Sequence, residues 1–461
     1  MRSISDPQSL LTEGLDAIRA QFDVPTGFAA PLLAAAEAAA RRAPSGHADW
    51  THAPFVTLDP ATSTDLDQAF AIERAGRDLV LHYAIADVPW FVADGDALDA
   101  EAWVRGTTTY LPDGKAGLYP PALSEAAASL LPDGDRPAIV LSVRVAPDGE
   151  ARLDAATRAL VRSRAKLAYE TARDEDLPAG FAELAERVAA AEARRGAARV
   201  DPPEQEVSRD GQGRFSLRFR AYNAAETRNA ALSLAANLAV ADAMLKAQTG
   251  LFRVMAPPGA DAEQRLRRTA EAFHLAWPAE MPLTQFERRL DHRNPREAAF
   301  MLAVRRAGDG ASYEVWREGR LPWHAAIAAP YAHCTAPLRR LADRHVLRAV
   351  LAIANGKPVP GEVTEAFARL PRVMARAGSR DGQIDRAVID LAEAALLARF
   401  EGQRFPALVT DFQKGMARIQ LCDLPVVAHA PASDALPGTP VEAQLLRADP
   451  VQRRLEFAPL G

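Results

Sequence analysis

The spacing of apolar residues changes from helical to strand-like and back along this 461-residue chain, and this alternation limits the folds open to it. Residues 1–46 carry two Ala- and Leu-rich helical patterns, over 7–22 and 28–42, on either side of a turn sequence with Pro and Gly. Strand-like apolar runs follow at 55–58, 69–72, 79–85 and 139–143. Helical patterns return at 182–195 and 226–248, and the pattern is mostly helical from about 260 to 400. The sequence therefore predicts an α+β fold in which a mixed sheet packs with helices.

Short strand patterns crowd the end of the chain. They lie at 407–412, 415–422, 426–428, 441–446 and 454–457, which favours a small OB-type barrel. Such barrels often hold single-stranded nucleic acid, and a β-appendage without a ligand fits the composition equally well. We therefore divide the chain into a small helical segment (1–46), a larger domain (47–402) and a barrel (403–461).

Composition excludes several classes of protein. Hydrophobic residues make up 48% of the chain and charged residues 25%, the balance of an ordinary folded protein. Its longest apolar stretches are shorter than the ~20 residues that a membrane span needs, and no signal-peptide pattern opens the chain, so we expect a cytoplasmic protein without membrane attachment. Cys334 and Cys422 stand too far apart in sequence to form a zinc cluster or a disulfide framework. The net charge of −5 leaves a local cationic groove open.

The segment 57–68 places three carboxylates, Asp59, Asp65 and Asp67, between two strand patterns. Residues two apart in an extended segment project to the same side, and a turn at Pro60 would bring Asp59 beside the other two. Clustered carboxylates repel one another unless a cation lies between them, and hard oxygen ligands suit Mg²⁺ or Mn²⁺. Such a metal site would support phosphoryl transfer. A solvated polar turn is the simpler interpretation of this stretch taken alone.

A second charged motif follows Pro337, where four arginines lie within ten residues. We expect Pro337 in the first turn of a helix, with Arg340, Arg344 and Arg348 on one helical face and Arg339 near the N-terminus. An arginine at a helix N-terminus is a candidate phosphate contact. A solvated surface face is the more usual role of such a pattern.

Taken in order, these motifs resemble those of the RNase II-like (RNB) exoribonucleases. The resemblance covers roughly residues 50–400, and the stretches that carry it are 57–68, 83–88, 98–113, 123–130, 236–237, 252–254 and 331–348. It implies an RNB-type catalytic domain ahead of the barrel. It also implies processive 3′→5′ hydrolysis of single-stranded RNA with a free 3′ end to nucleoside 5′-monophosphates, with two Mg²⁺ ions, or Mn²⁺ in their place, at the acidic cluster.

The resemblance also implies metal-binding and catalytic residues. By position in the motifs, Asp59, Asp65 and Asp67 correspond to the metal-binding and catalytic aspartates of the family. Asp65 and Asp67 form the catalytic set with Arg339, which corresponds to the arginine that stabilises charge on the scissile phosphate. Where the family usually has a second consecutive aspartate, this chain has Gln68. An amide oxygen coordinates metals but carries no charge, so Gln68 is predicted as a weakened ligand, and a catalytically weakened RNA-binding or RNA-processing factor is the alternative function.

The resemblance finally implies which residues contact RNA. Tyr110 corresponds to the tyrosine on which the terminal base stacks, with a plain core position as the alternative. Thr335, Arg339 and Arg340 are expected to contact the strand. Family members typically carry two cold-shock barrels before the catalytic domain, and residues 1–46 are too few for one barrel of roughly 70 residues, so we expect weaker RNA retention. These residues form either a helix-turn-helix-like module or a structural cap, and we expect a monomer.

Overall fold

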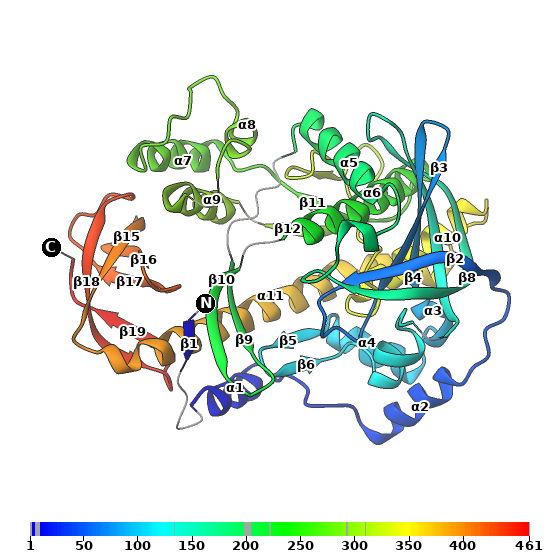
Figure 1. The fold of residues 1–461 in the computed structure, drawn as a ribbon, viewed down its shortest axis with the longest axis horizontal. Coiled ribbons are helices and arrows are strands. Elements are labelled where there is room, and N and C mark those ends of the chain that lie inside the picture. The colour runs from blue at the N-terminus through cyan, green and yellow to red at the C-terminus, as the bar shows by residue number, and fades with distance from the viewer. Residues whose placement is uncertain are drawn as a thin grey trace.

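The molecule consists mainly of a closed β-barrel, a smaller five-stranded sheet near the C-terminus, and a long helix that connects the two (Figure 1). The computed structural model describes residues 2–4, 10–132, 134–197, 204–220, 223–291, 294–308 and 310–460. No helix within these ranges is both long enough and apolar enough to span a membrane. Helix α11 (Gly361–Leu397) crosses from the closed barrel, at the right of Figure 1, to the smaller sheet at the left.

The closed barrel has five strands in the order β2-β3-β4-β7-β8. They are β2 (Ala48–Asp59), β3 (Gln68–Ala75), β4 (Asp78–Ala86), β7 (Arg136–Val145) and β8 (Ala151–Ala168). Neighbouring strands are antiparallel except β2 and β8, which close the barrel in parallel. Strands β4 and β7 are almost continuously apolar and buried, because helices cover the side that does not face the barrel interior. Helices α5 (Phe181–Arg195) and α6 (Ala224–Lys246) pack against β7, and α6 and α10 (Leu341–Ala354) pack against β8.

Between β4 and β7 the chain leaves the barrel and builds a small hairpin. Helices α3 (Val88–Phe91) and α4 (Ala97–Arg105) lead into β5 (Thr109–Leu111) and β6 (Gly114–Ala116), and a short π-helix (Leu123–Ala127) leads back. Gly106, just after α4, has a φ of 74°, and a Cβ there would lie 2.9 Å from the Cβ of Ala377 in α11. Only glycine satisfies both conditions without strain. This close approach places the hairpin directly against α11.

The remaining elements extend this frame. The N-terminal helices are α1 (Leu10–Gln21) and α2 (Ala30–Ala40), and single 3₁₀ turns lie at Asp174–Asp176 and Ala398–Phe400. A three-stranded sheet has the order β1 (Arg2–Ile4), β10 (Phe215–Arg220) and β9 (Glu204–Arg209). A four-stranded sheet has the order β12 (Ala311–Val315), β11 (Leu251–Met255), β13 (Trp323–His324) and β14 (Ala329–Pro330). Helices α7 (Ala260–Ala272), α8 (Leu283–Glu287) and α9 (Pro295–Ala307), at the upper left of Figure 1, share a separate apolar cluster.

The C-terminal sheet is nearly closed. Its strands are β15 (Arg404–Gln413), β16 (Met416–Leu421), β17 (Val427–Pro431), β18 (Pro440–Asp449) and β19 (Arg454–Phe457), in the order β17-β16-β15-β18-β19. The two edges meet where Leu460 N donates to Pro431 O at 2.8 Å, which confirms the predicted OB-type barrel. Glu393 of α11 holds the barrel, since its carboxylate accepts from Val427 N at 2.7 Å and from Gln205 Nε2 at 2.6 Å. Burial raises the pKa of Glu393 to about 8.

The predicted α+β class is confirmed, with exceptions in detail. The helical patterns 7–22 and 28–42 correspond to α1 and α2, although residues 7–9 lie outside the described part of the chain. Residues 260–400 are mostly helical as predicted, and three short strands interrupt the helices between 311 and 330. The sequence pattern does not predict β8, because alanines and arginines interrupt its apolar alternation over 18 residues.

Candidate active site

The predicted carboxylates lie where β2 ends and β3 begins. Asp59 is the last residue of β2, and β3 starts directly after Asp67. Within the connecting loop Leu66 is fully buried, and its N–H donates to Ser129 Oγ at 2.9 Å. This anchor fixes the positions of Asp65 and Asp67 on either side of Leu66.

Asp67 is the most enclosed of the three, with 4% of its surface exposed. Its Oδ1 accepts from Leu338 N at 2.7 Å, and its Oδ2 accepts from Arg339 Nε at 3.2 Å. The acidic and arginine motifs, 271 residues apart in sequence, are thus in direct contact. Burial raises the pKa of Asp67 to about 7, against the opposing effects of the Arg339 charge and the Leu338 N–H. Asp67 therefore titrates near neutral pH.

Asp65 is held by the β5–β6 hairpin. Tyr110 and Lys115 are directly opposite each other across this hairpin. The Tyr110 hydroxyl donates to Asp65 Oδ2 at 3.0 Å, and Lys115 Nζ lies 2.7 Å from Oδ1. Lys115 also reaches Glu125 Oε1 at 3.2 Å. Tyr110 is 48% exposed, so the interpretation of Tyr110 as a plain core residue does not apply, and its ring remains available to a ligand.

The side chain of Gln68 forms hydrogen bonds with the protein through both its nitrogen and its oxygen. Its Nε2 donates to the carbonyl of Thr335 at 2.6 Å. Its Oε1 accepts from the Tyr83 hydroxyl and, at 3.4 Å, from the Ser233 hydroxyl. The amide oxygen that was expected to face a metal therefore faces two hydroxyl donors.

Asp59 differs from the other predicted ligands. Its carboxylate makes no hydrogen bond or ion pair with any residue in the described ranges. Burial raises the pKa of Asp59 to about 6, Arg339 and Lys166 oppose the rise, and the Asp65 charge adds to it.

The predicted ligands do not fit two divalent ions in this arrangement. Across the part of the chain that the structure describes, no group of three or more His, Cys, Asp or Glu side chains is placed to hold a metal ion. Asp65 and Asp67 face protein cations, and the Gln68 oxygen accepts hydroxyl hydrogens. Among the three predicted carboxylates, Asp59 is the one without a hydrogen bond or ion pair to the residues that the structure describes, and Mg²⁺ usually binds through one or two carboxylates together with water and substrate phosphate.

The segment before α10 positions Arg339. Helix α10 begins at Leu341, so the prediction that Pro337 lies in its first turn is wrong, whereas Arg339 lies near its N-terminus, two residues before the helix. The segment instead pairs with the chain after α4, where Thr108 N donates to Arg339 O at 3.0 Å and Leu341 N donates to Gly106 O at 3.0 Å. The Arg339 side chain is 48% exposed, and its contact with the described residues is through Nε to Asp67, so its terminal nitrogens are available to a ligand.

Arg340 is oriented differently from Arg339. Two of its nitrogens donate to Asp343, each at 2.8 Å, and Asp343 Oδ2 also accepts from Ala336 N at 2.8 Å. The Asp343 side chain is fully buried, and this pair neutralises most of the Arg340 charge. Among the four arginines of the motif, Arg339 is the one whose two terminal nitrogens both lack a hydrogen bond or ion pair with the described residues.

The predicted arginine face of α10 is internal. Arg344 is 1% exposed and pairs with Asp99 of α4, and Arg348 pairs with Asp94. The interpretation of this face as solvated surface is therefore wrong, since both charges are matched by carboxylates that come from a distant part of the sequence.

A cavity of about 420 Å³ brings residues of the two motifs together. Its lining includes five of the predicted residues, namely Asp59, Gln68, Thr335, Arg339 and Arg340. The lining does not include Asp65, Asp67 or Tyr110. Asp67 contacts the lining residue Arg339, and Asp65 contacts Tyr110 of the hairpin. Its other walls include residues to which the resemblance assigns no role. Tyr331 and His333 lie within the stretch 331–348, and Tyr169, Glu226, Asn229 and Ser233 lie outside the stretches that carry the resemblance. Tyr169 directly follows β8, the strand without a sequence pattern, whereas Asn237, which donates to the Tyr331 hydroxyl at 3.0 Å, lies in a stretch that the family resemblance includes.

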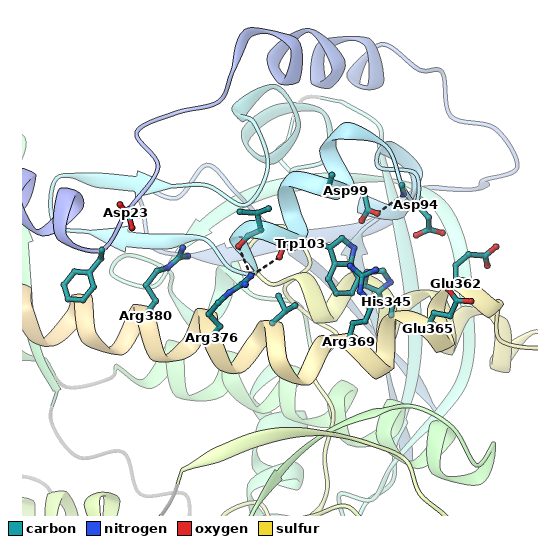
Figure 2. Close-up of a pocket in the computed structure, with 16 residues that line it drawn as sticks. Asp23, Asp94, Asp99, Trp103, His345, Glu362, Glu365, Arg369, Arg376 and Arg380 are labelled. Carbon is teal, nitrogen blue, oxygen red and sulfur yellow. Dashed lines mark hydrogen bonds between the residues drawn. The ribbon is translucent and has the colours of Figure 1, made fainter.

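A larger cavity, of about 1060 Å³, lies between α4 and α11 (Figure 2). No predicted site residue lines it. Arg376 donates to the carbonyl of Val104 at 3.2 Å, and Arg380 donates to the carbonyl of Arg105 at 3.2 Å and to Thr109 Oγ1 at 3.3 Å. The last carbonyls of a helix lack partners within the helix, and these arginines supply them. These hydrogen bonds hold α4 and the hairpin against α11, and the cavity lies between the two helices.

The closed barrel, its acidic and arginine-lined pocket and the small terminal barrel define an α+β protein with a site suited to a phosphate-bearing ligand. Residues 47–356 match the RNB domain, and residues 403–460 match the RNase II-type exonuclease C-terminal S1 domain. The chain belongs to the RNB-domain family.

Individual relatives agree with this assignment. Ribonuclease R 1 of Lactococcus lactis is 25% identical over 434 residues, which cover 86% of this chain and 52% of that protein. Ribonuclease R of Mycoplasma pneumoniae is 31% identical over 331 residues, 65% of this chain and 44% of the relative. The solved structure of Mycoplasma genitalium RNase R in complex with ribose methylated single-stranded RNA matches with a TM-score of 0.85 at 19% identity, over 97% of this chain and 78% of that one, and shows the shared fold. The chain spans about half the length of the curated relatives it matches.

Proposed function

We propose that the chain is a hydrolytic, processive 3′→5′ exoribonuclease that degrades single-stranded RNA to nucleoside 5′-monophosphates. The observation that carries the proposal is the buried Asp67 carboxylate, which is fixed by Leu338 N and holds the guanidinium of Arg339 at the pocket. Membership of the RNB-domain family and the RNA in the complex of the structural relative support the choice of substrate.

In the proposed mechanism Arg339 acts on the scissile phosphate. Its Nε is engaged by Asp67, so its terminal nitrogens keep one orientation and can donate to phosphate oxygens as negative charge develops there. Asp67 must be ionised for this role. The half-exposed ring of Tyr110 would stack on the terminal base, a contact that accepts any base because every base has a π-face.

The divalent cation is part of the proposal. Mg²⁺, with Mn²⁺ as a substitute, would bind when RNA contributes phosphate oxygens, because the free ligand set of the protein is small. Its chemistry would be to polarise the phosphate and lower the pKa of water. We also propose a cytoplasmic monomer, which light scattering of the purified chain and imaging of a tagged copy in cells would test.

The test is digestion of single-stranded RNA by the full chain. One RNA sample is labelled at the 5′ end and another uniformly, each is incubated with Mg²⁺ or with EDTA, and the products are resolved over time. With Mg²⁺ we expect the 5′-labelled RNA to give a short end product without intermediates and the uniformly labelled RNA to give nucleoside 5′-monophosphates. With EDTA we expect neither product. Asp67→Asn should abolish turnover and leave RNA binding intact, because the amide still accepts from Leu338 N but cannot pair with Arg339 as an anion.

A second candidate function is an RNA-binding or RNA-processing factor with weakened catalysis. The observation that favours it is the engaged amide of Gln68, at the position where the family usually carries a charged ligand. This candidate predicts intact RNA in both Mg²⁺ and Mn²⁺, with binding retained. Under the proposed exoribonuclease function the same samples lose their RNA.

A further inference from the structure

The cavity that Arg339 lines has polar walls that mostly carry no charge. Its charged lining residues are Asp59, Glu226, Arg339 and Arg340. Salt bridges to Arg220 and Asp343 match the charges of Glu226 and Arg340. The other polar groups of the lining include the hydroxyls of Tyr169, Ser233 and Tyr331 and the imidazole of His333. Neutral groups of this kind recognise the hydroxyl groups of a ligand, whereas a cation such as Arg339 recognises its phosphates.

The ring of His333 is held in one orientation by two tyrosines. Its Nδ1 lies 2.8 Å from the hydroxyl of Tyr313 in β12, and the two rings meet edge-on. Tyr331 packs edge-on against the same imidazole, with the ring centroids 5.3 Å apart. His333 Nε2 forms no hydrogen bond with any residue in the described ranges. Because His333 lines the cavity, Nε2 is the ring nitrogen that remains for a ligand.

His333 is surrounded by basic side chains, namely Arg340, Arg253, His324 and Arg339. Burial and these neighbours hold the pKa of His333 well below its usual range, so the imidazole is neutral. A neutral imidazole forms no ion pair with a phosphate, but one of its nitrogens donates a hydrogen bond and the other accepts one. A hydroxyl group both donates and accepts, so it pairs with Nε2 in either tautomer, whereas a phosphate oxygen pairs only with an Nε2 that carries the proton. The site therefore suits a hydroxyl better than a phosphate.

A strand of RNA presents both kinds of group side by side. Each ribose carries a 2′-hydroxyl, which DNA lacks, and each ribose is joined to a phosphate. His333 and Arg339 belong to the same segment before α10 and line the same cavity, and the charge of Arg339 is close enough to act on His333. The cavity thus offers a cation for a phosphate and, near it, a neutral imidazole for a sugar hydroxyl.

We propose that His333 is a specificity-determining residue that forms a hydrogen bond through Nε2 with a ribose 2′-hydroxyl of the bound strand. Tyr313 is the positioning residue that orients the imidazole for this contact. The chain then binds RNA more tightly than DNA of the same base sequence. This inference deepens the proposed exoribonuclease function, because it names how the substrate class is selected, and it rests on that function.

The test is the binding of single-stranded oligonucleotides by the full chain in EDTA, measured by fluorescence anisotropy. All oligonucleotides share one base sequence. They are an RNA, a series of RNAs with a single 2′-deoxy nucleotide at each 3′-terminal position in turn, and an all-deoxy strand with uracil bases. For wild type, one of the single substitutions should weaken binding about three- to tenfold, the effect of losing one hydrogen bond.

Three variants connect this effect to the imidazole. His333→Phe keeps an aromatic ring between Tyr313 and Tyr331 and removes both ring nitrogens. It should weaken binding of the RNA about three- to tenfold and leave binding of the all-deoxy strand unchanged, so that the sensitive 2′-deoxy substitution no longer has an effect. His333→Gln places an amide near the position of Nε2 and should keep most of the effect. Tyr313→Phe removes the hydroxyl that orients the imidazole and should reduce the effect in part.

The matched control is His82→Phe. His82 Nδ1 also lies close to a hydroxyl, that of Ser142 at 3.0 Å, and its ring packs edge-on against Trp50, but His82 does not line the cavity. This variant should bind every oligonucleotide as wild type does. Thermal unfolding shows whether each variant is folded. If His333→Phe does not fold, Tyr313→Phe decides the question, because it leaves the imidazole and the cavity lining in place.

Three results would overturn the inference. In the first, no single 2′-deoxy substitution weakens binding by wild type. In the second, the effect of the sensitive substitution persists in His333→Phe. In the third, His333→Phe weakens binding of the RNA and of the all-deoxy strand by the same factor, which would indicate a phosphate contact or a packing role.

Digestion of the RNA in Mg²⁺ is followed with the same preparations, so that the two proposals can fail separately. A 2′-hydroxyl effect that depends on His333, without digestion, refutes the proposed exoribonuclease function alone. Digestion together with a 2′-hydroxyl effect that does not depend on His333 refutes the role of His333 alone.

Discussion

Replacing Arg339 with glutamine tests whether its guanidinium keeps Asp67 ionised near neutral pH. Arg339 Nε lies 3.2 Å from Asp67 Oδ2. Two unit charges at about 4 Å interact by about 4 kcal/mol at an effective dielectric constant of about 20. Because the Arg339 side chain is 48% exposed, solvent screens the pair and we discount the effect to about 1.4 kcal/mol. That energy equals about one pH unit in the ionisation of Asp67.

The sign follows from which form of Asp67 is active. The pKa of Asp67 is about 7 in the folded chain, and the ionised form holds Arg339, so wild-type activity should rise with pH through about 7. In Arg339→Gln the residual activity should rise about one pH unit higher. The assay is kcat/KM on 5′-labelled single-stranded RNA from about pH 5 to about pH 9.

The control is Arg348→Gln, which removes another arginine–aspartate pair, with Asp94, from outside the pocket. Its pH profile should keep the wild-type midpoint. If the midpoint of Arg339→Gln coincides with that of wild type, the electrostatic link between Arg339 and Asp67 is refuted. Where turnover is too slow to follow, a carbon-13 NMR titration of Asp67 measures the same ionisation directly.

Further predictions concern binding and stability. Tyr110→Ala should weaken RNA binding by about 1–3 kcal/mol because base stacking is lost, whereas Tyr110→Phe should bind RNA as wild type does. Fluorescence anisotropy of labelled RNA in EDTA measures both affinities. Equal affinity of wild type and both variants would contradict the stacking role of Tyr110. Asp343→Ala should lower the free energy of unfolding by about 3–5 kcal/mol, because it leaves Arg340 without its partner, and urea denaturation measures the loss. The pKa of Glu393 is about 8 in the folded chain and 4.5 in the unfolded chain. Between these two pH values the folded chain binds one proton more than the unfolded chain, so the free energy of unfolding of wild type should fall as the pH rises from 4.5 to about 8. Glu393→Gln should show a flatter profile in the same denaturation series, and parallel profiles for the two chains would contradict this assignment.

The sequence predicts the position of the acidic loop well, because strong apolar patterns flank it. Strands β2 and β3 lie where the runs 55–58 and 69–72 predict them, so Asp59, Asp65 and Asp67 lie between strands as expected. The contact of Asp67 with Arg339 depends on two segments that meet only in the tertiary structure. Helical periodicity cannot supply that information.

The sequence pattern also could not predict the burial of the arginine face of α10. The spacing correctly places Arg344 and Arg348 on the helix, but burial of a charged face depends on which carboxylates face it. Those carboxylates are Asp99 and Asp94, some 250 residues earlier in the chain. Lys115 is similarly invisible to pattern analysis, since a single lysine in a short hairpin carries no signal until its neighbour across the loop, Asp65, is known.

Helix α11 connects the hairpin and the terminal barrel at a fixed distance. Ala377 of the helix packs against Gly106, next to the hairpin, and Glu393, sixteen residues later, accepts a hydrogen bond from Val427 of the barrel. That interval is about 24 Å at 1.5 Å per residue. Both contacts are buried, so one continuous helix fixes the separation between the hairpin that carries Tyr110 and the terminal barrel.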